Sequence, residues 1–332
     1  MNKRQLLKTM GATLALSLTL AAAATAQTTI RYAHVGSEGD IQFWYAEEFA
    51  NRVNERSEGR LQVQVFPNSQ LGGAQETVDG VRSGAIPLAH HEFASLANLM
   101  PEMGAFAAPF IYRDGTHAMA ATDPQNSEVM QEMVERMAEE ANIRVIGRLY
   151  RGARQMTANK AVYSPADLAG ERFRGVPLQL WTTMVSGMGA IPTPVEVAEL
   201  PTALMTGMVI GQENPLTMIN ANRLYEVQTH VMLTGHMQNV LPVFINEGFW
   251  QSLAEEDRAL IMEVAAEVGE ETLALGLAAE QDLIGELEGK GMTFITEADG
   301  LQVDAFRESV IAQVNADFPD WAPLMERIRA VE

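Results

Sequence analysis

Hydrophobic and polar positions change period several times along the first ninety residues of this chain. Residues 61–66 carry apolar side chains at every second position, which is the period of a strand. Residues 41–56 carry them three and four positions apart, which is the period of a helix. The same patterns predict two further strands and one further helix, at 29–35, 86–91 and 75–83. This alternation of strand and helix predicts an α/β fold with a parallel core sheet covered by helices on both faces.

The second half of the chain contains an unusually long helical pattern at residues 255–288. Globular helices average about 11–12 residues, so this helix should cross much of the molecule. Its small residues interrupt any heptad seam, which argues against a coiled coil. Between the two halves, we predict a helix at 125–140 and a strand at 143–150.

The first 26 residues have the pattern of a secretory signal peptide. Lys3, Arg4 and Lys8 precede an apolar run at 10–24, and Ala-Thr-Ala at 24–26 fits a cleavage site. The alternative is an uncleaved membrane anchor, but the apolar run is short for a bilayer span and leads directly into strand-like sequence. We therefore predict cleavage, export to the periplasm and no stable membrane insertion afterwards.

The charge of the chain excludes two classes of partner. The formal net charge is −20, and loss of the signal peptide, which holds three cations and no acid, would make it −23. Nucleic acids and anionic lipids both require a basic surface, so neither is expected to bind. The chain has no cysteine, which rules out disulfides and thiolate chemistry.

Candidate ligand-binding residues gather between positions 151 and 215. Arg154 lies in a strand-like run, Arg174 lies in another, and Asn214 follows a third. Ligands bind at strand ends in open α/β sheets, and a guanidinium matches the geometry of a carboxylate. The alternative is that both arginines are surface residues or pair with nearby acids. Trp181 either walls the same cleft or is simply buried.

The predicted strand at 86–91 contains His90 and His91 at its end and is followed directly by Glu92. Side chains alternate across a strand, so His90 and Glu92 would share a face. They could start a metal site, but two ligands alone make a weak one and no third is visible. They could instead contact a ligand in a cleft, or be solvated at a strand end. We favour the cleft and predict neither a metal nor a cofactor.

The ordered set of motifs resembles the substrate-binding proteins of TRAP transporters, the DctP-like family. The motifs are PNSQLG at 67–72, VRSGAI at 81–86, DLAG at 167–170 between the two arginines, GAIPTP at 189–194 and GQENP at 211–215. Together they cover most of the chain that follows the signal peptide.

The resemblance implies a two-lobed, periplasmic-binding-protein-like fold with a hinge, a ligand cleft between the lobes and a long helix spanning both. Lobe I would hold residues 27–151 plus 240–280, and lobe II residues 152–239 plus 281–332. The resemblance also implies roles for single residues. Arg174 occupies the position of the family's carboxylate-binding arginine, and Arg154 the position of a supporting arginine. Asn214 occupies the position of an amide that helps to hold the same carboxylate. Glu92 occupies the position of an acidic residue that contacts the ligand.

The implied function is capture of a small organic acid and its delivery to a TRAP membrane permease. One alternative is the same fold binding a non-acid solute, such as an amine or a sugar. The other is a secreted enzyme acting on a small carboxylate. We predict no catalytic residue, because the chain has no G-x-S-x-G elbow, no H-E-x-x-H and no cysteine.

Overall fold

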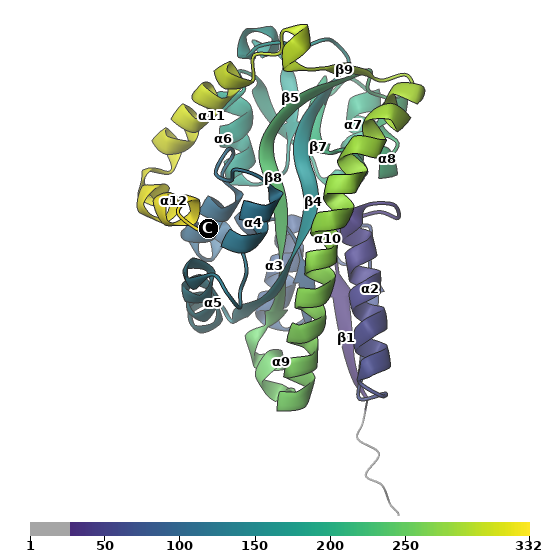
Figure 1. Cartoon of the computed structure of the whole chain (residues 1–332), viewed down its shortest axis with the longest axis vertical. Helices are drawn as coiled ribbons and strands as arrows, with labels where there is room; N and C mark the ends of the chain where they lie inside the picture. Colours follow the sequence, from purple (N-terminus) through teal and green to yellow (C-terminus); the bar gives the residue numbers. More distant parts are fainter. Residues whose placement is uncertain (1–26) are drawn as a thin grey trace, which may run out of the picture.

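The computed structural model describes residues 27–332, so the predicted signal peptide lies outside the described residues. The described chain forms one mixed sheet with helices packed around it (Figure 1). The strand order is β2-β1-β3-β8-β4-β7-β5-β6, with β9 beside β8. The strands are β1 Thr28–Ala33, β2 Leu61–Phe66, β3 Leu88–His90, β4 Ile143–Ala158, β5 Arg172–Gly175, β6 Ile191–Pro194, β7 Gly211–Pro215, β8 His230–Asn246 and β9 Thr293–Ile295.

Three helices of the first half lie close to the predicted ranges, namely α2 Ile41–Arg56, α3 Ala74–Ser83 and α5 Glu128–Ala141. The short helix α4 Gly115–Ala121 was not predicted. The helices of the second half are α6 Gln179–Gly187, α7 Leu200–Met205, α8 Leu216–Ala221, α9 Glu247–Ser252, α10 Glu255–Gly289, α11 Val303–Asp317 and α12 Ala322–Arg329. Short 3₁₀ turns connect several of them, among them η1 Phe93–Asn98, η2 Pro101–Ala107 and η4 Val197–Glu199.

The prediction of a parallel core sheet is wrong at its centre. β4 and β8, of 16 and 17 residues, run antiparallel to each other through the middle of the sheet. Parallel pairs lie on either side, with β1 between β2 and β3 at one end and β5 between β6 and β7 at the other. The sequence predicted the two halves of β4 separately, as a strand at 143–150 and a strand-like run around Arg154, and did not predict that they form one strand. The second half of β4 is buried but carries polar side chains, so the period-two signal is lost there.

The long helix α10 confirms the prediction for residues 255–288 and links the two ends of the sheet. It runs beside β4 for much of its length (Figure 1). Its first half packs Ile261, Val264 and Val268 into a hydrophobic cluster with α2 and β1. Its second half packs Leu283 and Leu287 into a separate cluster with α7 and α8. Burying each such side chain stabilises the fold by about 1.5–3 kcal/mol, so one helix stabilises both halves.

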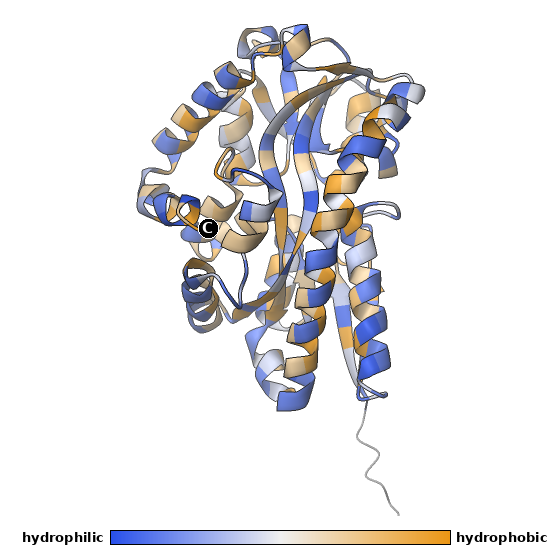
Figure 2. Cartoon of the chain, viewed as in Figure 1, coloured by the Kyte–Doolittle hydropathy of each residue, from blue (hydrophilic) through white to orange (hydrophobic). Residues whose placement is uncertain are grey.

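Hydrophobic and hydrophilic positions are interspersed along α10 (Figure 2). This mixture fits a helix that packs on the sheet along one side and meets water along the other. Within residues 27–332, no helix combines the length and the apolarity that crossing a bilayer requires.

Candidate functional site

A narrow pocket, with an enclosed volume of about 30 Å³, lies in the middle of the molecule, beside the long strands. Its walls come from elements far apart in the sequence: the segment after β1, the start of α2, the end of β3, β4, β5, η4, β7 and α8. Four of the six predicted ligand-binding residues line it together, namely Arg174, Arg154, Asn214 and Glu92. Pockets that hold small ligands range from about 300 to 1,000 Å³, so the walls of this one must move apart before a small organic molecule can enter.

An irregularity in β4 brings two arginines into the same pocket. Arg151 and Arg154 are three positions apart, and a regular strand would send them to opposite faces. The register with β8 shifts between Tyr150 and Ala153, where Gly152 adopts a positive φ of 103°. Such a bulge re-aims the side chains that follow it. The Ala153 N–H, which the bulge takes out of the ladder, donates to Glu280.

Arg154 is buried and paired with two carboxylates. Its Nε and Nη2 donate to the Glu213 carboxylate at 2.5 and 2.7 Å, and its Nη1 donates to Glu92 at 2.9 Å. Arg151 is also paired, because its Nη2 donates to Asp40 at 2.8 Å. The charges of both arginines are therefore offset by the protein itself. Asp40 also caps α2, so this ion pair ties the pocket to the start of that helix.

Glu213 joins three side chains behind the pocket and was not singled out by the sequence. It is fully buried and accepts from Arg154, from the Trp181 indole at 2.7 Å and from His236 at 3.0 Å. Burial alone would raise the pKa of this carboxyl, but Arg154 and the hydrogen bonds outweigh it and hold the pKa far below its usual value. Glu213 is therefore ionised, and His236 donates to it through Nε2.

Arg174 differs from the other two arginines of the pocket. It is 2% exposed, and its Nε donates to the Val195 carbonyl at 2.8 Å. Among residues 27–332, no carboxylate oxygen lies within 4.0 Å of its guanidinium; Glu196, which also lines the pocket, is farther away than that. Burial lowers the pKa of Arg174 to about 10, so the group stays charged at neutral pH. The pocket thus contains one buried cation without a carboxylate partner.

Asn214 lies within β7, although the sequence placed it after a strand. Its Nδ2 donates to Gln212 at 2.6 Å, which fixes the orientation of the amide at the pocket wall. Glu92 accepts from Asn239 at 2.9 Å in addition to Arg154. Both side chains are held in place by the surrounding protein. A ligand would meet polar groups that are already oriented, which lowers the cost of binding.

His90 does not line the pocket, and the expected alternation with Glu92 is wrong. β3 ends at His90 and the chain turns into η1, so His91 and Glu92 both face the pocket instead. His90 is fully buried in the core, with Nδ1 2.7 Å from the Tyr32 hydroxyl. Burial, followed by the nearby arginines, lowers the pKa of His91 to about 3. The neutral ring accepts the Glu92 N–H at Nδ1, which leaves its Nε2–H as a donor.

Trp181 supports the pocket from behind and does not line it. Its side chain is fully buried, the Arg154 guanidinium lies 5.2 Å from the ring centroid, and its N–H donates to Glu213. Of the two alternatives that the sequence left open, the structure places this tryptophan in the buried one. The indole fixes the Arg154–Glu213 pair from the side away from the pocket.

Gln42 is a pocket residue that the sequence analysis missed. It is 2% exposed, and its Nε2 donates to Asp40 at 2.7 Å, which assigns the amide orientation. Within the described part of the chain, its Oε1 has no hydrogen-bond partner. A buried acceptor without a partner costs free energy, so a ligand that donates to it would be favoured. The only sequence signal was its place just inside the first turn of a helix.

The pocket contains carboxylates and histidines, but the described residues include no group of three or more acidic, histidine or cysteine side chains able to hold a metal. Its chemistry is that of ion pairs and directed hydrogen bonds. These features fit the reversible capture of a small polar ligand.

Comparison with known proteins places this architecture in a family. The family model described as "Bacterial extracellular solute-binding protein, family 7", DctP, matches residues 32–317. A solute-binding protein of Roseobacter denitrificans is 31% identical over 313 residues, which is 94% of each chain. The chain therefore matches such proteins over nearly their whole length.

Solved structures show the same fold. A TRAP periplasmic solute-binding protein of Roseobacter denitrificans with bound L-galactonate gives a TM-score of 0.83 at 29% identity, covering 91% of this chain and 98% of that one. A second from that organism, with bound 3-deoxy-D-manno-oct-2-ulosonic acid, gives 0.85 at 28% identity, covering 92% and 100%. This likeness confirms the predicted α/β fold of two lobes; the residue limits of each lobe stay predictions.

Proposed function

Because the chain belongs to the bacterial extracellular solute-binding proteins of family 7, the receptors of TRAP transporters, we propose that it captures a small hydroxylated carboxylic acid in its central pocket. It does so in the periplasm and delivers the acid to the membrane subunits of a TRAP permease. Relatives of this chain are periplasmic TRAP proteins, and two of the structures similar to it hold sugar acids. The acid is the ligand class that this pocket favours.

Arg174 is the observation that carries the proposal. The guanidiniums of Arg151 and Arg154 already meet carboxylates at 2.8 and 2.5 Å, whereas Arg174 is equally buried and meets none within 4.0 Å in the described chain. Its terminal nitrogens can form two parallel hydrogen bonds to one carboxylate. In a pocket that excludes water, such a pair is stronger than at the surface.

The rest of the pocket favours hydroxyl groups on the ligand. Gln42 Oε1 and the Glu92 carboxylate are acceptors, and the Nε2–H of His91 is a donor. A hydroxyl group can donate to the first two and accept from the third. An acid with hydroxyls along its carbon chain therefore satisfies more of these groups than a plain fatty acid or an amine.

The pocket walls come from both predicted lobes, and this arrangement couples binding to closure. Gln42, His91 and Glu92 belong to the predicted lobe I, and Arg174 and Asn214 to the predicted lobe II. A ligand that contacts both sides gains its full set of contacts only when they meet, so it favours the closed form. The closed, loaded form is then the state that a permease would recognise.

Thermal unfolding of the signal-free protein with a panel of small acids and their amides tests the proposal. An acid at about a thousand times its dissociation constant should add roughly 4.1 kcal/mol of stability. For a protein of this size, the midpoint should rise on the order of ten degrees. The matching amides, which carry no charge, should give no shift. Shifts by amines or neutral sugars and by no acid would contradict the proposal, and steady turnover of a bound acid would indicate an enzyme.

Replacing Gln42 by methionine should weaken the recognition of ligand hydroxyls. The change keeps the side-chain length but removes the Oε1 acceptor, while Asp40 keeps its bond to Arg151. A buried hydrogen bond contributes about 1–1.5 kcal/mol, so the affinity for the hydroxylated acid should fall about tenfold. The affinity for the analogue lacking the hydroxyl should be nearly unchanged. Calorimetric titration of both ligands measures the difference; an equal loss for the two would mean that Gln42 has only a structural role.

A further inference from the structure

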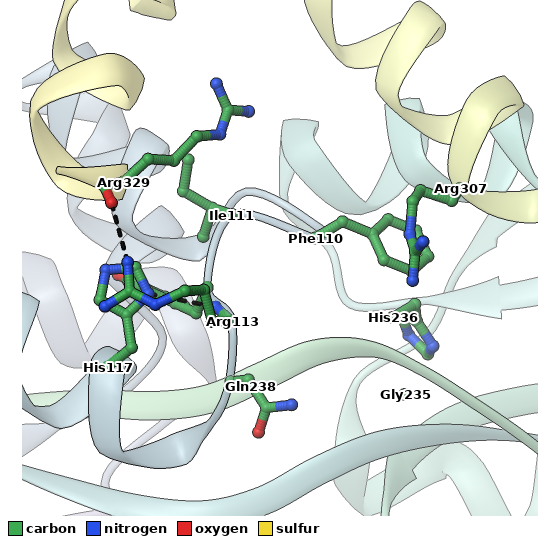
Figure 3. Close-up of a pocket in the computed structure, with 10 residues that line it drawn as sticks. Phe110, Ile111, Arg113, His117, Gly235, His236, Gln238, Arg307 and Arg329 are labelled. Atoms are coloured by element: carbon green, nitrogen blue, oxygen red, sulfur yellow. Dashed lines mark hydrogen bonds between the residues drawn. The ribbon is translucent and has the colours of Figure 1, made fainter. Parts of the chain in front are cut away.

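A second cavity, of about 460 Å³, lies between β8 and the C-terminal helices and shares no lining residue with the ligand pocket. Its walls are the loop after η2, the helix α4, the β8 segment 235–238, and one residue each of α11 and α12 (Figure 3). The family function proposed above does not use this cavity, so its lining requires a separate explanation.

The charges in the cavity wall are opposite to those of the whole protein. The chain has 43 acidic and 23 basic residues. Three arginines line this one cavity, Arg113 from the loop, Arg307 from α11 and Arg329 from α12. Among the described residues, no aspartate or glutamate lines it. In a protein with nearly twice as many acidic as basic residues, a cavity wall whose charged side chains are all arginines creates a local site of positive potential.

The protein leaves these arginines largely uncompensated. Arg113 donates at 3.0 Å to the carbonyls of Arg329 and Val331, which orients it without neutralising its charge. Arg307 stacks on Phe110 at 5.2 Å and pairs with Asp304 at 2.9 Å, in an exposed pair of the kind that contributes little. Within residues 27–332, the Arg329 side chain forms no ion pair or hydrogen bond. Figure 3 shows the three arginines arranged around the cavity.

The neutral polar groups of the wall are either occupied or available as donors. His117 accepts the Arg113 N–H at Nδ1 and donates to the Ile328 carbonyl, so both of its nitrogens are engaged. His236 is engaged by Thr234 and Glu213. Gln238 accepts from the Tyr150 hydroxyl at 2.7 Å, which leaves its Nε2 as a donor on the cavity side. The side-chain groups left for a ligand are therefore mainly donors and cations.

We propose that this cavity binds a multivalent oxyanion, held by the guanidiniums of Arg113, Arg307 and Arg329 and by the amide of Gln238. Guanidinium groups bind oxyanions through paired N–H donors, and several of them select for more than one negative charge. Inorganic sulfate or phosphate and a small organic polycarboxylate share this chemistry. The bound anion would link the loop after η2 to α11 and α12, three segments that otherwise meet around an open cavity.

Calorimetric titration of the signal-free protein with sulfate and, separately, with citrate tests the proposal, with chloride at equal ionic strength as the blank. One equivalent of at least one of these anions should bind at millimolar concentrations. The variants Arg307→Gln and Arg329→Gln should each weaken that binding at least fivefold. Arg327→Gln is the matched control for Arg329→Gln, because Arg327 lies on the same helix, α12, but pairs with Glu132 outside the cavity. This control should change the affinity less than twofold.

The source of the anion and the place of binding are read from the same titrations. Binding of sulfate indicates a site for inorganic oxyanions, and binding of citrate alone indicates a site for polycarboxylates. The proposal is overturned if neither anion binds, or if the cavity variants bind as tightly as the unchanged protein. It is also overturned if Arg174→Ala abolishes the binding while the cavity variants do not, because the anion would then occupy the ligand pocket. These outcomes do not depend on which acid the ligand pocket takes.

Discussion

Replacing Arg174 by alanine should weaken the binding of the acid ligand by two to three orders of magnitude. The change removes the one buried cation of the pocket that has no carboxylate partner among the described residues, and it leaves the ligand carboxylate buried without a counter-charge. Breaking a buried ion pair costs about 3–5 kcal/mol, and each 1.4 kcal/mol is about a tenfold change in affinity. Calorimetric titration with the acid identified in the thermal panel measures the loss.

Arg172→Ala is the matched control for this prediction. Arg172 lies two residues earlier on the same strand, is exposed and does not line the pocket. The control removes the same charge from the protein, so it reports any long-range electrostatic effect on the ligand. The affinity of Arg172→Ala for the acid ligand should stay close to that of the unchanged protein. A loss of less than about fivefold in Arg174→Ala, or an equal loss in both variants, would contradict the assigned role of Arg174.

Replacing Glu213 by glutamine should destabilise the protein by about 3–5 kcal/mol. The change keeps the side-chain shape but leaves the buried Arg154 without its closest counter-charge and places an amide against its N–H donors. It also alters the acceptor for Trp181 and His236. For a protein of this size, the unfolding midpoint should fall on the order of ten degrees. Glu226→Gln, an exposed acid outside the pocket, should leave the midpoint nearly unchanged.

The effect of Glu213 should depend on pH in a defined direction. In the folded protein, its pKa lies far below the value of about 4.3 expected in the unfolded chain. A depressed carboxyl pKa contributes stability that is complete above the unfolded pKa and is lost as the pH falls toward the folded pKa. The stability difference between the unchanged protein and Glu213→Gln should therefore be constant from pH 7 to about 5 and shrink below about pH 4. A difference that grows toward low pH would contradict this account of the buried ion pair.

The sequence predicted the elements that a regular hydrophobic pattern marks. The helix at 41–56 and the strand at 61–66 have the predicted bounds, and the long helix differs by one residue at its end. In these segments, apolar side chains repeat with one period because one face meets one hydrophobic core. The apolar period of β4 is interrupted where its polar residues turn toward the pocket, so the sequence predicted two separate strand-like segments and not one long strand.

The sequence predicted the side chains of the pocket better than their partners. Arg154, Arg174, Asn214 and Glu92 line one pocket, as the motifs and the resemblance implied, although their contact with a ligand stays a prediction. Glu213 and Gln42 were missed because nothing in their local sequence shows which buried group lies opposite. His90 was misplaced because an alternation rule holds only inside a strand, and β3 ends at that residue. Partners across the fold depend on tertiary packing, which a local pattern does not encode.

A crystal structure of the signal-free protein with the acid identified in the thermal panel would show directly whether Arg174 holds the ligand. We expect the ligand carboxylate within hydrogen-bonding distance of the terminal nitrogens of Arg174, with Asn214 beside it. We also expect a ligand hydroxyl that donates to Gln42 Oε1. A ligand whose carboxylate lies away from Arg174, or one held outside the central pocket, would contradict the claim that this buried arginine captures the acid.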